Sequence, residues 1–482
     1  MANLTCAPTA EVLKLVLERI SDTSATVQVS ALQAAANLAR YFSDQLLQMG
    51  ILDLVQPILL SYTQYDHLKY SLLTSALNFL DVLAQENSGF CLALSRSQVV
   101  DLCLGILGSE KKEVFVVACE LLTTCAEDNS EFSAKILASS AQLYETIKHL
   151  PSLERMVGVY LLVTASLSCL EFNNLSMLVE QFTYFLSIDP YEDFLSNVLP
   201  KVENQELFKS HYHVWEQDIK SQQVALECFT NLLSCDSEET PVGTQFLSEQ
   251  LIERITKIGG GLSLEVAKKL TNLPEAFSNV LVCQTQAHNF IQNLVINTDV
   301  QFNFSFLWDQ LFWTLENTLS LHDEVPELFE DLANLESEVS KCLMLLVKKG
   351  YVEEAGTYLE RALSILENLE DKKYMLGTLG VMSSHMQMQQ ASKVIQVLMA
   401  ACSDSNTELV VEALNCFFDV FCDERFDQAL KDFNVIQTMK TGFQTFQEQV
   451  SAVQDAEVRD NAEEALANLE EFIKYKEAHI TY

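Results

Sequence analysis

The sequence has little glycine and proline, with 14 Gly and 8 Pro among 482 residues. These two residues supply most tight turns, so their scarcity argues against a turn-rich β architecture. Hydrophobic residues make up 49% of the chain, which is enough to bury an extended core. The composition therefore predicts a large helical protein.

Long apolar runs are also missing. No segment reaches the roughly 18 apolar residues of a membrane-spanning helix, and even residues 156–170 are interrupted by Thr164, Ser166 and Ser168. The first residues, Met-Ala-Asn-Leu-Thr-Cys, do not resemble a secretory signal. The 13 Cys are scattered through apolar stretches without a CxxC pair, which predicts buried thiols in a reducing compartment. We therefore expect no membrane partner and a location in the cytoplasm and the nucleus.

Enzyme and metal-site motifs are absent from the sequence. It contains no GxSxG, no HExxH, no paired-glycine dinucleotide motif and no set of kinase motifs. His211 and His213 have neither a nearby Cys nor a helical i, i+4 partner, so the spacing of a metal site is missing. Carboxylates are so abundant that no pair stands out as acid and base. We therefore predict a protein without catalytic residues, cofactor or metal.

Basic residues are scarce relative to acidic ones. The 30 Lys and Arg stand against 67 Asp and Glu, which gives a formal net charge of −37. Such a field repels nucleic-acid phosphates and anionic lipids and steers cationic partners toward the protein. The charge predicts a basic protein partner, no direct nucleic-acid binding and a monomeric chain. The alternative is that the acidity only keeps a large apolar array soluble.

What the sequence does contain is a repeated helical register, in which an Ala is followed six residues later by a position that is polar in most copies. The six copies, each given as the Ala and the residue six positions on, are Ala31 and Asn37, Ala76 and Val82, Ala118 and Thr124, Ala225 and Asn231, Ala287 and Asn293, and Ala413 and Asp419. The copies are offset by 45 residues (31 to 76), 42 (76 to 118) and 126 (287 to 413), which is three units of 42. These offsets match the HEAT/armadillo period of roughly 40–47 residues. The middle offsets of 107 and 62 residues are irregular.

This period predicts an all-α fold, a right-handed ARM/HEAT-repeat α-solenoid in which stacked helix pairs form a superhelix with a concave binding wall. We expect armadillo-like repeats over residues 1–170 and an irregular repeat with a short acidic loop over 171–245. HEAT-like repeats with a C-terminal capping helix are expected over 246–482. That last helix is predicted as a single segment near 443–478.

The position six residues after each Ala is the expected binding line. An Asn amide offers a donor and an acceptor together, so it can bond the backbone of an extended ligand. The alternative is that these Asn residues only cap or satisfy neighbouring turns. Trp215, at a predicted helix start, is either a groove anchor or part of the interior. The expected partner-binding residues are Asn37, Glu120, Glu127, Asp128, Trp215, Asn231, Asn293 and Asp419.

A second acidic stretch covers residues 316–338, which contain no Lys or Arg. Helical periodicity places Glu327, Asp331 and Glu338 within about 40° of one another. This phase predicts a cation-binding stripe, and a simple solvated face is the alternative.

Four phrases of the sequence together resemble a known family. They are residues 117–129 (Val-Ala-Cys-Glu-Leu-Leu-Thr-Thr-Cys-Ala-Glu-Asp-Asn), 215–227 (Trp-Glu-Gln-Asp-Ile-Lys-Ser-Gln-Gln-Val-Ala-Leu-Glu), 412–421 (Glu-Ala-Leu-Asn-Cys-Phe-Phe-Asp-Val-Phe) and 468–475 (Asn-Leu-Glu-Glu-Phe-Ile-Lys-Tyr). In this order they resemble the symportin family of ARM/HEAT-repeat nuclear import adaptors.

The resemblance implies an adaptor and chaperone for the two basic ribosomal proteins that accompany 5S rRNA, of the L-five and L-eleven type. It implies that the adaptor promotes their nuclear import for large-subunit ribosome biogenesis, with an importin-type transport receptor as a further partner. Family members begin with a basic Pro-Tyr import signal, whereas Pro190-Tyr191 here lies between Asp189 and Glu192. The family's long acidic insertion corresponds here to residues 236–240 at most. A generic HEAT-repeat scaffold or regulatory protein that binds other basic or extended partners is the alternative.

Overall fold

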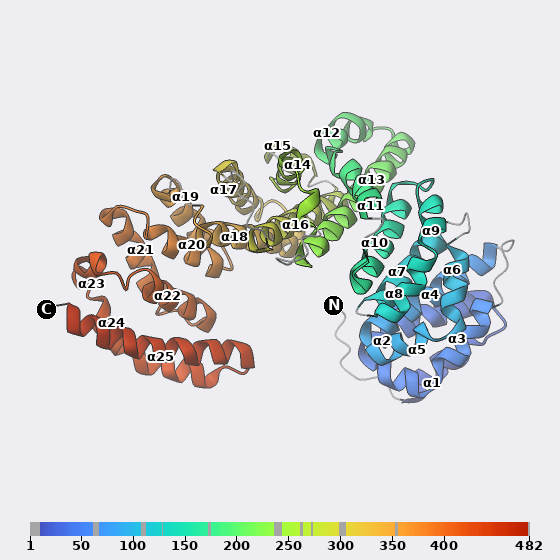
Figure 1. The fold of residues 1–482 in the computed structure, drawn as a ribbon, viewed down its shortest axis with the longest axis horizontal. Coiled ribbons are helices and arrows are strands. Elements are labelled where there is room, and N and C mark those ends of the chain that lie inside the picture. Colours follow the sequence, from blue (N-terminus) through green and yellow to red (C-terminus); the bar gives the residue numbers. More distant parts are fainter. Residues whose placement is uncertain are drawn as a thin grey trace. The chain divides into compact units, whose positions relative to one another are not determined.

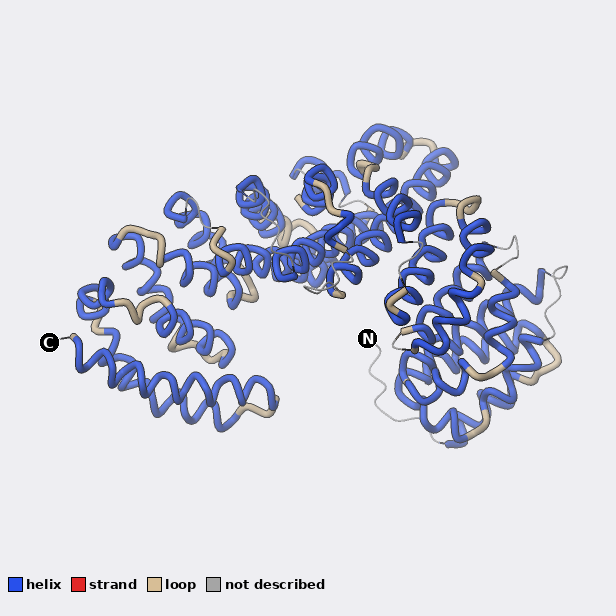
Figure 2. The backbone as a smooth tube through the Cα atoms, in the orientation of Figure 1, coloured by secondary structure: helices blue, strands red, loops and turns tan. Residues whose placement is uncertain are grey.

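The computed structural model describes residues 10–60, 67–107, 112–127, 129–171, 175–235, 243–260, 264–270, 273–297, 305–351 and 355–480. These residues form α-helices joined by short turns, with brief 3-10 and π segments and no β-strand among them (Figure 2). The predicted all-α solenoid of the ARM/HEAT type is confirmed.

The chain divides into two compact units. Unit 1 comprises residues Met1–Ile188 and His213–Cys235, and unit 2 comprises Asp189–Tyr212 and Asp236–Tyr482. Residues 171–245, which were expected to form an irregular repeat of their own, are shared between the two units. One boundary falls inside the 30-residue helix α13 (Gln205–Ser234).

Unit 1 is a stack of helices in which α2, α4, α7 and α10 pack against one another in chain order and the others cover them (Figure 1). The buried Gln222 of α13 donates to the carbonyl oxygens of Phe185 (3.0 Å) and Ile188 (2.7 Å), which joins α13 to the end of α11. The helices are α1 (Ala10–Ile20), α2 (Ala25–Gln48), α3 (Ile51–Leu60), α4 (His67–Glu86), α5 (Ser88–Ser95), α6 (Gln98–Ile106), α7 (Lys112–Ala126), α8 (Ser130–Ala138), α9 (Ser140–Ile147), α10 (Ser152–Cys169), α11 (Leu175–Leu186) and α13 from His213 onward.

Unit 2 repeats the same plan. Helices α14, α16, α18, α20, α22 and α25 pack in succession, while α17, α19 and α21 lie along one side of them (Figure 1). The helices are α12 (Pro190–Asp193), α14 (Glu249–Gly259), α15 (Leu264–Leu270), α16 (Pro274–Asn297), α17 (Ser305–Leu319), α18 (Phe329–Lys348), α19 (Ala355–Asn368), α20 (Lys373–Ser383), α21 (Met388–Ala401), α22 (Thr407–Asp419), α23 (Asp427–Asp432), α24 (Val435–Ala452) and α25 (Ala456–His479).

The repeated alanines mark the core side of the inner helices. All six are buried, with at most 7% of their surface exposed, whereas the residues six positions later are exposed or half-buried. A small side chain at this place lets two stacked helices approach closely, while the later position stays at the surface. The sequence pattern is therefore the register in which the inner helices stack.

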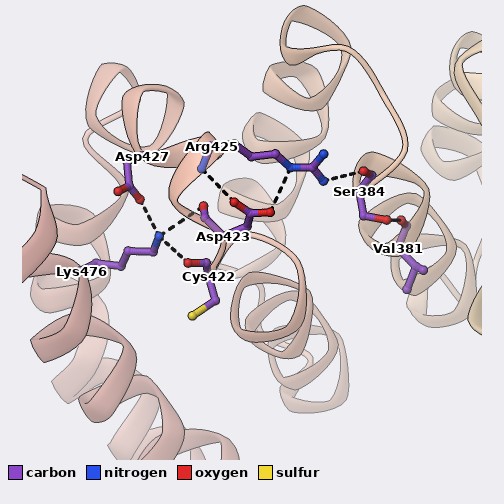
Figure 3. Close-up of polar contacts among 7 residues, drawn as sticks. All are labelled: Val381, Ser384, Cys422, Asp423, Arg425, Asp427 and Lys476. Carbon is purple, nitrogen blue, oxygen red and sulfur yellow. Dashed lines mark hydrogen bonds and ion pairs between the residues drawn. The ribbon is translucent and has the colours of Figure 1, made fainter.

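The end of unit 2 is held by a buried lysine (Figure 3). Lys476 of α25 is 0% exposed, and its Nζ donates to Oδ1 of Asp427 (2.5 Å) and to the carbonyl oxygens of Cys422 (2.8 Å) and Asp423 (3.5 Å). Arg425 beside it donates to the carbonyl of Ser384 (2.5 Å), just after α20. The bonds of Lys476 tie α25 to the turn between α22 and α23 and to the start of α23.

The predicted single helix near 443–478 is wrong, because the chain breaks between α24 and α25. Asp455 is the N-cap of α25 and its carboxylate accepts from the amides of Glu457 (3.0 Å) and Val458 (3.1 Å). An Asp in this position satisfies amides that a helix start leaves unbonded.

The predicted cation-binding stripe in residues 316–338 is also wrong. Glu327 lies in a 3-10 turn before α18 begins, so it is not in helical register with the other two carboxylates. Asp331 accepts from the hydroxyl of Ser278 (2.7 Å), and Glu338 accepts from the side-chain amide of Gln292 (2.7 Å). These carboxylates therefore hold α18 against α16.

Candidate partner-binding surface

The inner helices of unit 1 bring acidic side chains from three helices together beside a tyrosine. We call this set, made of Asp81 (α4), Glu120 and Glu127 (α7), Tyr160 (α10) and Glu227 (α13), the acidic cluster. Electrostatic interactions join Asp81 to Glu120, and join Tyr160 to both Glu127 and Glu227. The cluster therefore runs from α4 across α7 and α10 to α13.

Hydrogen bonds from neutral donors fix the geometry of the cluster. The hydroxyl of Thr124 donates to Oδ1 of Asp81 (2.7 Å), which links α7 to α4. The hydroxyl of Tyr160 donates to Oε1 of Glu227 (2.8 Å), which links α10 to α13. The side-chain amide of Asn231 lies 3.5 Å from the same hydroxyl. These bonds fix the positions of the Asp81 and Glu227 carboxyl groups in the fold.

The electrostatics of the cluster favour a cation from outside. Burial by the surrounding protein, together with the charge of Asp81, raises the pKa of Glu120 to about 7. Burial also raises the pKa of Asp81 despite the hydrogen bond from Thr124. Among the described residues, no Lys or Arg acts on the pKa of either carboxyl. Glu120 nevertheless remains open to solvent.

The predicted binding residues of unit 1 lie in different surroundings. Glu120 and Glu127 belong to the acidic cluster, Asn231 borders it, and Asn37 is exposed on α2. The assignment of Trp215 as a binding residue is wrong: it lies in the middle of α13 rather than at a helix start, and it is 1% exposed. Its indole belongs to the interior of unit 1, because a buried ring cannot meet a partner.

The remaining predicted residues lie elsewhere. Asp128 is outside the described residues, and so are residues 236–240 of the expected acidic loop. Asn293 donates to the carbonyl of Asn289 (3.0 Å) and accepts from Asn297 (3.3 Å), so its amide is engaged within α16. This is the alternative that the sequence left open, and it removes Asn293 from the predicted line of ligand-binding amides. Asp419 is exposed at the end of α22 in unit 2.

The sequence contained a regular signal for one missed residue of the acidic cluster, Glu227. The position two residues after each repeated Ala is polar in all six copies and is exposed or half-buried in every one. It precedes the predicted binding position by four residues, so the two share one helix face. The six residues at this position are Gln33, Asn78, Glu120, Glu227, Asn289 and Asn415.

A metal site and a membrane-spanning helix are two other features that the described part of the chain could contain. There, no three His, Cys, Asp or Glu side chains are grouped in a way that could hold a metal ion. None of the described helices is by itself long and apolar enough to cross a membrane, although the bent pair α5 and α6 meets both requirements when its halves are combined.

Comparison with known proteins finds similarity to helical-repeat proteins. A family model described as SYO1-like, TPR repeats, matches residues 241–480. The Schizosaccharomyces pombe armadillo repeat protein involved in nucleocytoplasmic transport, Syo2, is 32% identical over 119 residues, which cover 23% of this chain and 18% of that protein. The chain thus matches less than a fifth of that relative's length.

Importin beta and the karyopherin Kap121p are two of the solved structures that match the chain. Importin beta matches with a TM-score of 0.50 and 12% identity, over 97% of this chain and 60% of that one. The karyopherin Kap121p matches with a TM-score of 0.45 and 14% identity, over 97% and 54%. The likeness to importin beta concerns the helical solenoid fold alone. The match of residues 241–480, about half of the chain, to the family model shows that this protein belongs to the SYO1-like, or symportin, family.

Proposed function

We propose that this chain is a nucleocytoplasmic transport adaptor and chaperone for the basic ribosomal proteins of the 5S ribonucleoprotein. The observation that carries the proposal is the acidic cluster of unit 1, in which Glu120, Glu127 and Glu227 are exposed and Asp81 is buried. No Lys or Arg of the described residues acts on the pKa of Asp81 or Glu120. Family membership and the transport role in the name of the Syo2 relative support it. We further propose that the chain moves between cytoplasm and nucleus with this cargo.

The cluster would act by presenting carboxyl groups at fixed positions to a cationic segment. Lys and Arg side chains that enter the inner surface would replace water around Glu120 and Glu227 and relieve the repulsion between neighbouring carboxylates. The same contacts would cover basic side chains that otherwise attract RNA phosphates. The protein would therefore both hold the cargo and keep it from binding nucleic acid prematurely.

An importin-type receptor is part of the proposal, but Pro190-Tyr191 is not its docking signal. The hydroxyl of Tyr191 donates to the carbonyl of Ile258 (2.6 Å), and Asp189 pairs with Lys257 (2.6 Å). This segment packs against the end of α14, so it is not available as an extended peptide.

Affinity capture tests the proposal directly. The tagged full chain is incubated with cytosol, and the retained proteins are identified by mass spectrometry. We expect basic ribosomal proteins that bind 5S rRNA to dominate, and expect Glu120→Lys to lose them. Recovery of other partners in their place would favour the generic scaffold.

Association with a basic cargo is expected to depend strongly on salt. Raising the ionic strength from about 0.05 to 0.5 M shortens the Debye length from about 14 to about 4 Å, which should slow association at least about tenfold. Stopped-flow fluorescence with a labelled basic cargo measures the rate. A rate that does not change with salt would remove the net charge of −37 from the mechanism.

Affinity for an arginine-rich peptide is expected to rise with pH. The unbound Glu120 has a pKa of about 7, and a nearby cation favours its ionised form, so binding releases a proton below that pH. The affinity should therefore increase up to about tenfold between roughly pH 6 and 8, because arginine does not titrate in this range. Isothermal titration at both pH values checks this, and Glu120→Gln should remove most of the dependence. If the Glu120→Gln variant keeps the full pH dependence, Glu120 is not the group whose ionisation controls binding.

A further inference from the structure

A polar pocket lies in unit 2, where α20, α22 and α25 meet. Its volume is about 340 Å³. The lining side chains are mostly carboxamides and carboxylates, with a few small apolar groups between them. They are Lys373, Glu408, Val411, Glu412, Asn415, Val458, Asn461, Glu464, Ala465 and Asn468. None of these residues was predicted to bind a partner.

Three asparagines in the pocket have unused hydrogen-bonding capacity. Asn415 of α22 is half-buried, and Asn461 and Asn468 of α25 are exposed. Their side-chain amides form no hydrogen bond with any part of the chain that the structure describes, in contrast to Asn293. Each offers two N–H donors and one acceptor oxygen, which is the combination needed by a peptide backbone.

The spacing of these amides fits an extended chain. Asn461 and Asn468 are seven residues apart, so they lie on one face of α25 with a rise of about 10 Å between them. Three residues of an extended polypeptide span about the same length. Asn415 faces them from α22 across the same pocket. The two walls could therefore bond a strand along about three of its residues.

The charged residues of the pocket favour a ligand with a positive charge. Lys373 pairs with Glu408 (2.9 Å), which leaves Glu412 and Glu464 as further carboxylates at the pocket. Glu412 lies against the backbone of α20, where a Cβ on Gly377 would overlap its carboxylate. Burial raises the pKa of Glu412, while Lys348 and Lys373 act in the opposite direction. An additional positive group would stabilise the charged form.

We propose that this pocket binds an extended polypeptide segment, whose backbone is bonded by Asn415, Asn461 and Asn468 and which directs a Lys or Arg side chain at Glu412 and Glu464. The pocket belongs to unit 2 and shares no residue with the acidic cluster of unit 1. It therefore does not depend on the function proposed for that cluster. A divalent cation is the less favoured occupant, because the amide N–H donors would have no role in binding it.

The test uses the full chain in the Glu120→Lys, Glu227→Lys background, so that binding at the acidic cluster is suppressed. The probe is a fluorescein-labelled 12-residue Gly-Ser peptide carrying spaced arginines, and polarisation is measured at low salt. Matched probes carry citrulline in place of arginine, or N-methyl groups on the backbone. We expect the arginine peptide to bind, and expect either replacement to weaken it at least about fivefold, as for one lost hydrogen bond or ion pair.

Variants of the pocket separate local from general effects. Glu412→Gln and the double variant Asn461→Ala, Asn468→Ala should each weaken the arginine peptide at least about fivefold. The matched control is Glu463→Gln, an exposed residue of α25 outside the pocket lining, which should leave binding unchanged. Circular dichroism checks that each variant is folded. If the asparagine double variant does not fold, the affinity of Glu412→Gln alone tests the proposal.

Three results would overturn the proposal. The first is no binding of the arginine peptide, and the second is equal binding by Glu412→Gln and Glu463→Gln. The third is displacement of the peptide by millimolar Ca²⁺ but not by added salt of equal ionic strength, which would indicate a cation site. None of these results bears on capture of ribosomal proteins by the chain without substitutions, so failure here leaves the proposed function to its own experiment.

Discussion

Replacing Lys476 by Met is expected to destabilise unit 2 by about 3 kcal/mol or more, because Asp427 and two backbone carbonyls would lose the ammonium that bonds them. Met has a similar length and keeps the packing of the methylene chain, so the loss reports on the polar contacts. Chemical denaturation of the full chain measures the change, and hydrogen exchange of peptides from α25 locates it. The largest increase in exchange should fall on α25 and on the turn that holds Cys422 and Asp423.

Lys474→Met is the matched control. Lys474 lies on the same helix, two residues away, but is exposed and pairs with Glu470 within one helical turn. Such a surface pair contributes about 0.3–0.5 kcal/mol. If both variants lose the same small amount, the buried lysine is not what holds α25. Because α25 forms one wall of the pocket, Lys476→Met should also weaken the arginine peptide.

Reversing two charges in the acidic cluster should nearly abolish binding of a basic cargo. Glu120→Lys with Glu227→Lys replaces two attractions by two repulsions on the inner surface of unit 1, and like charges at an interface cost several kcal/mol. We expect the affinity to fall by a factor of about 100 or more. Stability should change by only about 1 kcal/mol, because Glu227→Lys loses the hydrogen bond from Tyr160 while a Lys at position 120 relieves the repulsion between Asp81 and Glu120. Titration calorimetry and thermal unfolding measure the two effects.

The control for this double variant changes the net charge equally at a different place. Glu18→Lys with Glu180→Lys alters two exposed carboxylates of α1 and α11, which lie outside the inner layer of α2, α4, α7 and α10. This pair should slow association moderately and leave the dissociation rate unchanged. Equal losses of affinity in the two double variants would mean that the acidity acts only as a long-range field.

The binding surface was only partly predictable from the sequence. Glu120 and Glu127 were identified from their place in the repeat, and both belong to the acidic cluster. Asp81, Tyr160 and Glu227 were missed because a cluster depends on which helices become neighbours, and the offset from α7 to α13 is irregular. Trp215 was misplaced because the start of α13 was predicted ten residues too late, which made a core residue look like one at a helix end.

The sequence by itself determined the helical class and the register of the repeat. Alanines at a fixed spacing indicate which face of each inner helix packs against its neighbour, because only a small residue permits such a close approach of two helices. Tertiary structure alone decided which polar side chains remain available to a partner. Asn293 and Asn415 are the same residue type on inner helices, yet Asn293 is bonded within α16 and Asn415 faces a pocket completed by α25. The hydrogen bonds and neighbouring charges of a side chain arise from helices distant in the sequence, so they exist only once the helices have packed.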